Sequence, residues 1–576
     1  MTHINLAQAC RRTEYADRDD ERNPWAEWAV MYCSVFKHFS PKALDGVYAT
    51  AFLREQMEHL KAKHAILARL GLKGAYHANE PMWLPNKVYA RHPHWRGARG
   101  DNSLRTTELL FSPCVDQPEV LDLYREAVTE IVKAAPSIDT FTFGTNDAGA
   151  TLCWTENAYP GQNGPSFCAS RSMGQRVMGF LKAVRDAARA AGSREACAYM
   201  SETHFTPGES ATLRPLLESG AGIVDSPQPD KPADATIKGV GGWSPWGTFV
   251  NKLPFPFRFV SGLEGARKSG TQDVRIGWYL GSTDPDVFTA LKCWLESPPL
   301  KGTAGTHELV RRIAEAQFGA GPADDVTEAW VELNKSLDIA SAGAIPQVLG
   351  MGVMANRWLV RPILATQEKL TEEEIAYFKR WVYQTEPDGW KDYLTTHRRR
   401  LAGTWAHASL ISNIALKAAG HARAAAGGYR RAMDKADGAA VRQRLELHAL
   451  RAEAQRCLLI NVSNTVLIAT LALERNRHAG RFTERGDPLE PAARDGGKPT
   501  QALQQLMRSE LENTCELISL LRRASEPLLL TEDRKSDEGY FRFGPDVIEQ
   551  LEKKAELIQR HWRDADGLFF MPTNGT

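Results

Sequence analysis

IDTFTFGTNDAGATLCW, residues 138–154, joins an apolar run to a polar loop. Small and apolar β-forming residues run from Ile138 to Phe143, and the segment after them is too short and too rich in glycine for a helix. The pattern predicts a buried strand, and helical patterns flank it at 119–134 and 170–191. Residues beyond the C-terminal ends of barrel strands line active sites, so Asn146 and Asp147 are the first functional candidates. The alternative is a simple turn, which suits both residue types.

Six further short apolar runs end in polar residues, as buried strands commonly do. They are residues 29–36, 71–78, 196–200, 222–224, 257–261 and 274–280. Helical patterns separate several of the runs, so the series predicts repeated βα units and a parallel sheet. We expect an α/β fold with a (β/α)8 TIM-type barrel in which one strand is not recognised; an open doubly wound sheet is the alternative. The barrel is favoured because no glycine-rich phosphate-binding fingerprint follows the first run.

The chain changes character near Thr306. Apolar residues then recur at helical spacing, for example in HELVRRIAEAQFG and EEEIAYFKRWVYQ, and no convincing strand follows. We expect a polar N-terminal arm at 1–25, a catalytic barrel at 26–304 and an all-α helical C-terminal domain at 305–576. The helical domain either caps the barrel or mediates a homodimer.

The overall composition is that of an ordinary globular protein. The 71 Lys plus Arg nearly balance the 70 Asp plus Glu, so there is no electrostatic case for a nucleic-acid or membrane partner. The N-terminus lacks the apolar core of a signal peptide, and no uncharged run approaches the roughly 20 residues of a membrane span. We therefore expect a cytoplasmic protein, with a trimmed export signal as the alternative.

Metal and cofactor motifs are missing from the sequence. The nine cysteines include no CxxC pair, and the one HxH motif, His92-Pro93-His94, lies inside a loop. HExxH, GxSxG and P-loop patterns do not occur either. We expect no metal and no cofactor.

The predicted strand ends carry mainly carboxylates. They are Glu80, Asp147, Glu202, Asp225, Glu264 and Asp284, with Asn146 and His204 beside them. Glycoside hydrolysis needs one carboxylic acid to protonate the leaving oxygen and one carboxylate as base or nucleophile. Each residue alone could form a salt bridge or cap a helix. A shared site explains carboxylates at six strand ends better than six unrelated structural roles.

Aromatic and basic residues accompany these carboxylates in the same loops. They include His77, Trp83, Trp154, Trp243, Trp246, Trp278 and Arg267. Flat aromatic faces can stack on sugar rings, although a single tryptophan more often belongs to the core. Arg267 is expected to pair either with a uronate carboxylate of a substrate or with Glu264.

Several phrases resemble a known group of glycosidases. The order GLKGAYHANEPMWLP, HPHWRG, LLFSPCVDQPEVLDLYREAVTEIV and the 138–154 stretch is similar to the barrel of the family 67 α-glucuronidases and of related barrels near the family 20 β-hexosaminidases. The resemblance spans residues 30–340 and implies Asp147 or Glu202 as acid and Asp225 or Glu264 as base. The hexosaminidase Asp-Glu pair is replaced here by Asn146-Asp147, and uronate specificity is not carried over.

We expect a glycoside hydrolase that cleaves an O-glycosidic bond in an oligosaccharide or glycoside by paired-carboxylate acid/base catalysis. A non-hydrolytic carbohydrate-binding barrel and a metal-dependent hydrolase or lyase are the alternatives. Glu202 is the expected acid, because strand alternation should aim it and His204 into the barrel mouth. Asp147 is expected to fix substrate or water, and the aromatic, basic and remaining polar residues to bind the sugar.

Overall fold

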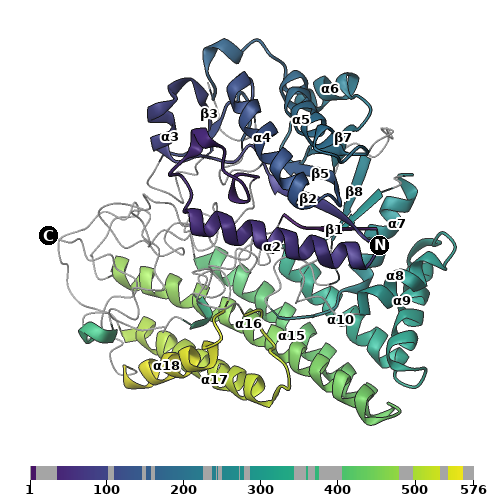
Figure 1. Ribbon diagram of the computed structural model, residues 1–576. Helices are drawn as coiled ribbons and strands as arrows, with labels where there is room; N and C mark the ends of the chain where they lie inside the picture. The colour runs from purple at the N-terminus through teal and green to yellow at the C-terminus, as the bar shows by residue number, and fades with distance from the viewer. Residues whose placement is uncertain are drawn as a thin grey trace. The chain divides into compact units, whose positions relative to one another are not determined.

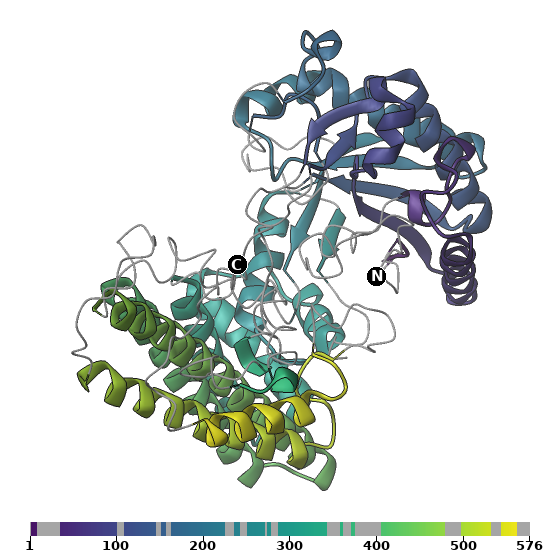
Figure 2. The same cartoon turned by 90° about the vertical axis from the view of Figure 1, so that its left-hand side faces the viewer.

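The computed structural model divides the chain into two compact units (Figures 1 and 2). The sheet unit comprises residues 1–239 and 268–275, and the helical unit comprises residues 240–267 and 276–576. The structure describes residues 2–7, 35–100, 109–145, 151–156, 163–224, 236–241, 243, 250–270, 273–277, 286–342, 358–360, 370–374, 405–478, 497–531 and 543–561. Among these residues, no helix combines the length and apolar character that a membrane crossing requires.

Seven strands form one curled sheet in the order β1-β2-β5-β6-β7-β8-β9. They are β1 (His3–Asn5), β2 (Lys73–Asn79), β5 (Ile138–Gly144), β6 (Cys197–Ser201), β7 (Ala221–Val224), β8 (Thr236–Val240) and β9 (Asp273–Ile276). The five neighbouring pairs from β1 to β8 are parallel, which confirms the predicted parallel sheet. A separate antiparallel hairpin joins β3 (Arg96–Arg99) to β4 (Phe111–Pro113).

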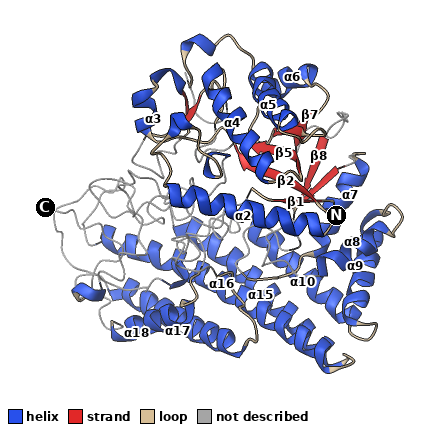
Figure 3. Ribbon diagram, viewed as in Figure 1, coloured by secondary structure: helices blue, strands red, loops and turns tan. Residues whose placement is uncertain are grey.

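Helices follow the strands of the sheet unit as the repeated βα pattern predicts (Figure 3). The main ones are α2 (Thr50–Arg69), α4 (Pro118–Ala134), α5 (Met173–Ala190) and α6 (Pro207–Leu213), and the shorter ones are α3 (Asn86–Arg91), η1 (Val35–Lys37), η2 (Lys42–Leu44), η3 (Pro93–Trp95), η4 (Ser166–Cys168) and η5 (Arg214–Leu216). Local signals fix the starts of two of them. Proline occupies the first position of α4, and a capping box of Ser172 and Gln175 begins α5.

Aromatic rings form the main contact between the sheet and its helices. Phe141 and Phe143 of β5 stack on the same face, and Phe143 meets Phe180 of α5 edge to face at 5.1 Å. Tyr124 of α4 completes this aromatic layer, with its ring 4.9 Å from that of Phe180. Burial of four such rings stabilises the layer by several kcal/mol, on the order of 2 kcal/mol for each ring.

The helical unit contains the long C-terminal helices that the 3.6-residue periodicity predicts. They are α7 (Pro256–Lys268, whose last residue belongs to the sheet unit), α8 (Asp286–Leu295), α9 (Gly302–Phe318), α10 (Ala323–Ala342), α15 (Trp405–Asp434), α16 (Ala439–His478), α17 (Gly497–Arg523) and α18 (Val547–Arg560). Small residues allow α15 and α10 to pack closely. A Cβ placed on Gly428 of α15 would lie 3.0 Å from the Cβ of Ala329 on α10.

A fully buried ion pair joins Lys554 to Glu510, which also accepts hydrogen bonds from Asn461 and Asn464.

One strand prediction is wrong, and a second fails at the two residues where the structure describes it. Residues 257–261 belong to helix α7, because the buried residues Pro256, Phe259, Val260, Leu263 and Ala266 recur every three to four positions and not every two. Residues 35 and 36 lie in the 3-10 turn η1, and the rest of the run 29–36 lies outside the described residues. The sequence pattern also missed β1 and β8, which have only three and five residues.

Helix α5 approaches the end of α6 at Gly174, where a Cβ would overlap the carbonyl oxygen of Thr212. We expect Gly174→Ala to destabilise the fold by about 1–3 kcal/mol, because the backbone of α6 must move away. Gly179→Ala in the same helix is the matched control, since a Cβ there meets nothing within 4 Å and should stabilise the helix by up to about 1 kcal/mol. Thermal unfolding of the two variants measures the difference, and equal melting temperatures would show that this contact does not constrain α5.

Candidate active site

The face of the sheet opposite the aromatic layer carries polar side chains. His77, Thr142 and Tyr199 are register partners on the adjacent strands β2, β5 and β6. Each of the three lies two residues before the end of its strand. They therefore form a row at one depth, just below the C-terminal edge of the sheet.

Arg275 of β9 reaches this row at His77. Its Nη1 lies 3.2 Å from Nδ1 and 3.4 Å from Nε2 of the imidazole. Nδ1 of His77 also lies 2.9 Å from Oγ1 and 3.2 Å from the carbonyl oxygen of Thr142. Donation from Nδ1 to Thr142 leaves Nε2 to accept from the guanidinium. Because four strands separate β2 from β9 in the sheet order, this contact requires the sheet to curl.

The three side chains of the row are uncharged, and the cation beside them is Arg275. Burial and the positive charge of Arg275 lower the pKa of His77 to about 4, so the imidazole is uncharged at neutral pH. Burial, the neighbouring Cys197 and the carboxylate of Asp273 raise the pKa of Tyr199 above its ordinary value. The row thus combines hydroxyl and imidazole groups, which hydrogen-bond without charge, with one fixed cation.

Glu202 follows β6 directly and is fully buried. Its Oε2 accepts a hydrogen bond of 3.2 Å from Nη2 of Arg214, whereas Oε1 has no hydrogen-bond partner within the part of the chain that the structure describes. Arg214 belongs to η5, which packs on α5, so the carboxylate is tied to the helical layer. Strand alternation was expected to aim Glu202 and His204 together into a barrel mouth; in the structure Glu202 is buried and His204 is exposed, so the two side chains do not share one environment.

Six predicted site residues lie outside the described residues, namely Asn146, Asp147, Asp225, Trp246, Trp278 and Asp284. The strands that lead to two of these residues, Asp147 and Asp225, and to the described Glu202 are nevertheless in place. β5, β6 and β7 are neighbours in the sheet and end three, one and one residues before Asp147, Glu202 and Asp225.

Glu80 follows β2 but turns away from the polar row. Its Oε1 accepts from the backbone N–H of Val35, and its Oε2 accepts from the backbone N–H of Met82 and from the hydroxyl of Tyr124. The side chain is fully buried, and this burial raises the pKa of Glu80 to about 7 against the opposing effect of the hydrogen bonds. The hydrogen bonds of Glu80 thus connect η1, the residues after β2 and α4, and all of its partners belong to the protein.

Glu264, Arg267 and Trp243 belong to the helical unit. Glu264 lies inside α7 and does not follow a strand; it accepts from Nε1 of Trp294 at 2.7 Å and forms an ion pair with Arg267 at 2.8 Å. Arg267 therefore pairs with Glu264, which is one of the two partners expected for it. Trp243 is 2% exposed and packs edge to face against Phe259, as a core residue does.

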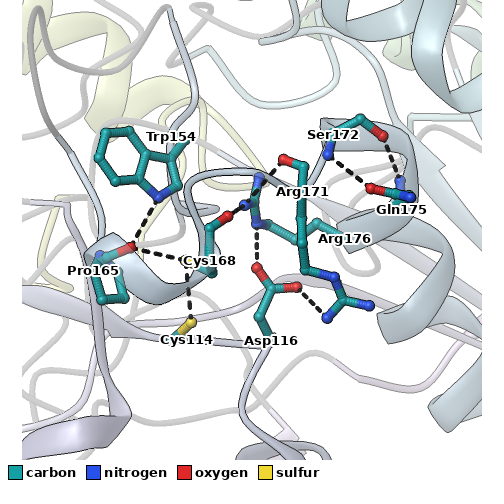
Figure 4. Close-up of polar contacts among 9 residues, drawn as sticks. All are labelled: Cys114, Asp116, Trp154, Pro165, Cys168, Arg171, Ser172, Gln175 and Arg176. Carbon is teal, nitrogen blue, oxygen red and sulfur yellow. Dashed lines mark hydrogen bonds and ion pairs between the residues drawn. The ribbon is translucent and has the colours of Figure 1, made fainter.

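The two remaining tryptophans contribute to packing. Trp83 is 7% exposed, and Trp154 lies half-buried on a group of cysteines. Trp154 has a left-handed backbone conformation with φ of 62°, and its Nε1 donates to the carbonyl oxygen of Pro165 at 3.2 Å (Figure 4). A positive φ on a bulky residue is strained, so other contacts must hold this loop in place.

The cysteines under Trp154 are a feature that sequence spacing did not reveal. Cys114, Cys153 and Cys168 are 39 and 15 residues apart in the chain, yet all three are buried together. They are the one group of three potential metal ligands found among the described residues. Hydrogen bonds with Cys114 and Cys168 raise the pKa of Cys153 well above its ordinary value, and the contact with Cys153 lowers the pKa of Cys168 to about 6.

Comparison with known proteins finds no matching family model and no matching curated protein. Among solved structures, the chain is similar to a family 138 glycoside hydrolase that targets pectin rhamnogalacturonan II, with 11% identity, a TM-score of 0.46, and coverage of 97% of this chain and 66% of that chain. A chitobiase of Flavobacterium johnsoniae follows with 11% identity, a TM-score of 0.28, and coverage of 97% and 73%. An endo-β-mannanase/endo-β-glucanase of Prevotella bryantii has 12% identity, a TM-score of 0.24, and coverage of 55% and 42%. These neighbours are glycoside hydrolases, but at such TM-scores the assignment of a function rests on the residues of the chain itself.

The contact of Arg275 with His77 predicts how the imidazole titrates. We expect His77 to bind no proton until the pH falls to about 4, because the folded pKa lies below the ordinary value of 6.5. Arg275→Gln removes the repelling charge, so the pKa of His77 should rise. NMR titration of histidine-labelled protein measures both values, and His77→Gln assigns the signal. Titration of His77 near pH 6.5 in the unmodified protein would contradict the described contact.

Proposed function

We propose that the protein is a glycoside hydrolase that cleaves an O-glycosidic bond at the C-terminal edge of its sheet. The observation that supports this most is the adjacency of β5, β6 and β7. Their ends lead into Asp147, Glu202 and Asp225. Because the three strands are parallel, all of them end at the same edge of the sheet. Paired carboxylates at one edge are what acid/base hydrolysis of a glycosidic bond requires.

Glu202 is the acid in this proposal. Arg214 donates to Oε2, whereas Oε1 has no hydrogen-bond partner within the described ranges, so we assign Oε1 to the leaving oxygen. A buried oxygen without a partner is costly, and a ligand oxygen would satisfy it. Asp147 fixes the substrate or the attacking water, and Asp225 is the base or nucleophile.

The polar row supplies the sugar-binding floor below these carboxylates. His77 is uncharged at neutral pH, and the hydroxyls of Thr142 and Tyr199 both donate and accept hydrogen bonds. Such groups match the hydroxyls of a sugar ring.

The finer architecture belongs to the same proposal. We take the seven-stranded curled sheet as part of a (β/α)8 barrel whose catalytic region runs from residue 26 to 304, with β1 (His3–Asn5) added from the N-terminal segment, followed by the helical domain. The contact between β9 and β2 supports closure, since it brings together strands that stand far apart in the sheet order. A cytoplasmic location and a homodimer through the helical domain remain predictions.

A carbohydrate-binding protein without hydrolytic activity is the second candidate. One observation favours it: Glu202 is fully buried and its Oε2 pairs with Arg214, as expected of a carboxylate that holds the structure together. The two candidates share a binding site and differ only in proton transfer.

Replacement of the proposed acid distinguishes the two candidates. Glu202→Gln should lower turnover of oligosaccharides by about two or more orders of magnitude, because an amide cannot protonate the leaving oxygen. Aryl glycosides with good leaving groups should lose far less. Glu218→Gln is the matched control, since Glu218 is a half-exposed residue that pairs with Arg185.

The measurement is a comparison of turnover for both substrate kinds in the two variants. If the protein binds oligosaccharides but neither substrate kind is hydrolysed by the unmodified chain, the binding candidate replaces the hydrolase. If Glu202→Gln retains full turnover while Asp147→Asn is inactive, the acid has been assigned to the wrong strand.

A further inference from the structure

Three thiols from separate segments meet in the interior of the sheet unit. Cys114 follows β4, Cys153 lies in the loop after β5, and Cys168 ends η4. Their exposed fractions are 0%, 1% and 0%, and their Sγ atoms all lie within 4.8 Å of one another. We call this group the three-cysteine cluster; Figure 4 shows two of its members, Cys114 and Cys168.

The sulfur spacing matches that of thiolates around one metal ion. Sγ of Cys114 and Sγ of Cys168 are 3.9 Å apart. Thiolates at about 2.3 Å from a zinc ion with tetrahedral angles are about 3.8 Å apart. A disulfide needs sulfurs about 2.0 Å apart, so the two sulfurs are not bonded, and their spacing is one that shared coordination would keep.

The charges next to the cluster suit a zinc ion. Asp116 is buried and binds two arginines, Arg176 at 2.8 Å and Arg171 at 3.0 Å. Arg176 also donates to the carbonyl oxygen of Cys168 at 2.9 Å. Two arginines and one aspartate sum to +1, and Zn²⁺ with three thiolates carries −1. Cu⁺ with three thiolates would carry −2 and leave a buried charge uncompensated.

The walls of the cluster are packed closely enough to hold the thiols in place. A Cβ on Gly97 of β3 would lie 3.0 Å from Sγ of Cys153, and a Cβ on Gly164 would lie 3.0 Å from Cβ of Cys153. Asn163 ties the same loop to β3, since its Oδ1 accepts from the backbone N–H of Arg99 at 2.7 Å. A site assembled by packing before the ion arrives costs less to occupy.

We propose that the three-cysteine cluster binds one Zn²⁺ ion, and that this ion braces the loop after β5. Binding takes the three sulfurs as thiolates, so any thiol proton still present leaves to solvent as the three sulfur–zinc bonds form, and no redox change is involved. Three protein ligands leave the fourth tetrahedral position to a group from outside the cluster. The braced loop follows the strand end that leads to Asn146 and Asp147, so the ion has a structural role, independent of the proposed hydrolase activity.

Metal binding to the full chain tests the proposal directly. After reduction and removal of metal with a chelator, the protein should take up one equivalent of Zn²⁺ by elemental analysis. Cd²⁺ as a probe should produce sulfur-to-metal charge-transfer absorption that saturates at one equivalent. Zn²⁺ should also raise the melting temperature and protect three of the nine cysteines from alkylation.

Cysteine variants locate the site. Cys168→Ser should weaken Zn²⁺ binding on the order of 100-fold or more, since one of three thiolates is lost. Cys457→Ser is the matched control, because Cys457 is equally buried but lies in the helical unit. Alkylation mapping of the unmodified protein gives the same answer if Cys168→Ser does not fold.

The proposal is overturned if the reduced protein binds no Zn²⁺, or if Zn²⁺ leaves Cys114, Cys153 and Cys168 as reactive as before. It is also overturned if Cu⁺ binds and Zn²⁺ does not. A disulfide between Cys114 and Cys168 in freshly isolated protein, with Zn²⁺ uptake still absent after reduction, would replace the metal site by a redox pair.

Discussion

The parallel pairing of β5 with β2 on one side and β6 on the other is the constraint on which the sheet unit depends. It directs Phe141 and Phe143 into the aromatic layer and Thr142 into the polar row. A slip of one residue would exchange the two faces and bury polar groups against the helices. The hydrophobic layer therefore fixes the register, and the register in turn sets the depth of the polar row below the strand ends.

The carboxylates that the structure describes differ in how fully their oxygens are hydrogen-bonded. Glu80 and Glu264 use their oxygens within the protein, on backbone N–H groups, a tyrosine hydroxyl and an indole. Glu202 differs because one of its oxygens has no hydrogen-bond partner among the described residues. The difference in hydrogen bonding separates residues that the sequence alone could only group together.

The sequence predicted four of the strands at the centre of the sheet. Strands β2, β5, β6 and β7 lie within two residues of the predicted runs, because each is an apolar run that ends in polar residues. The run 257–261 was assigned to a strand because five residues are too few to distinguish a period of 2 from one of 3.6. The helix α7 became recognisable only with its full length and its buried set.

The candidate site was less accessible to sequence reasoning. Arg275 lies inside β9, so a search of strand ends could not find it, and only the curl of the sheet brings it to His77. The direction of Glu202 depends on Arg214 of a later turn, twelve residues away. The three-cysteine cluster joins segments 39 and 15 residues apart, a spacing that matches no local metal motif.

The central claim is that water cleaves a glycosidic bond at the edge formed by β5, β6 and β7. The most direct measurement is mass spectrometry of the products released from a panel of oligosaccharides and polysaccharides in oxygen-18-labelled water. Hydrolysis predicts that each newly formed reducing end carries one labelled oxygen at its anomeric carbon. Products that are unsaturated and free of label would indicate a lyase, and bound glycans that remain intact would indicate a binding protein; either result would contradict the account.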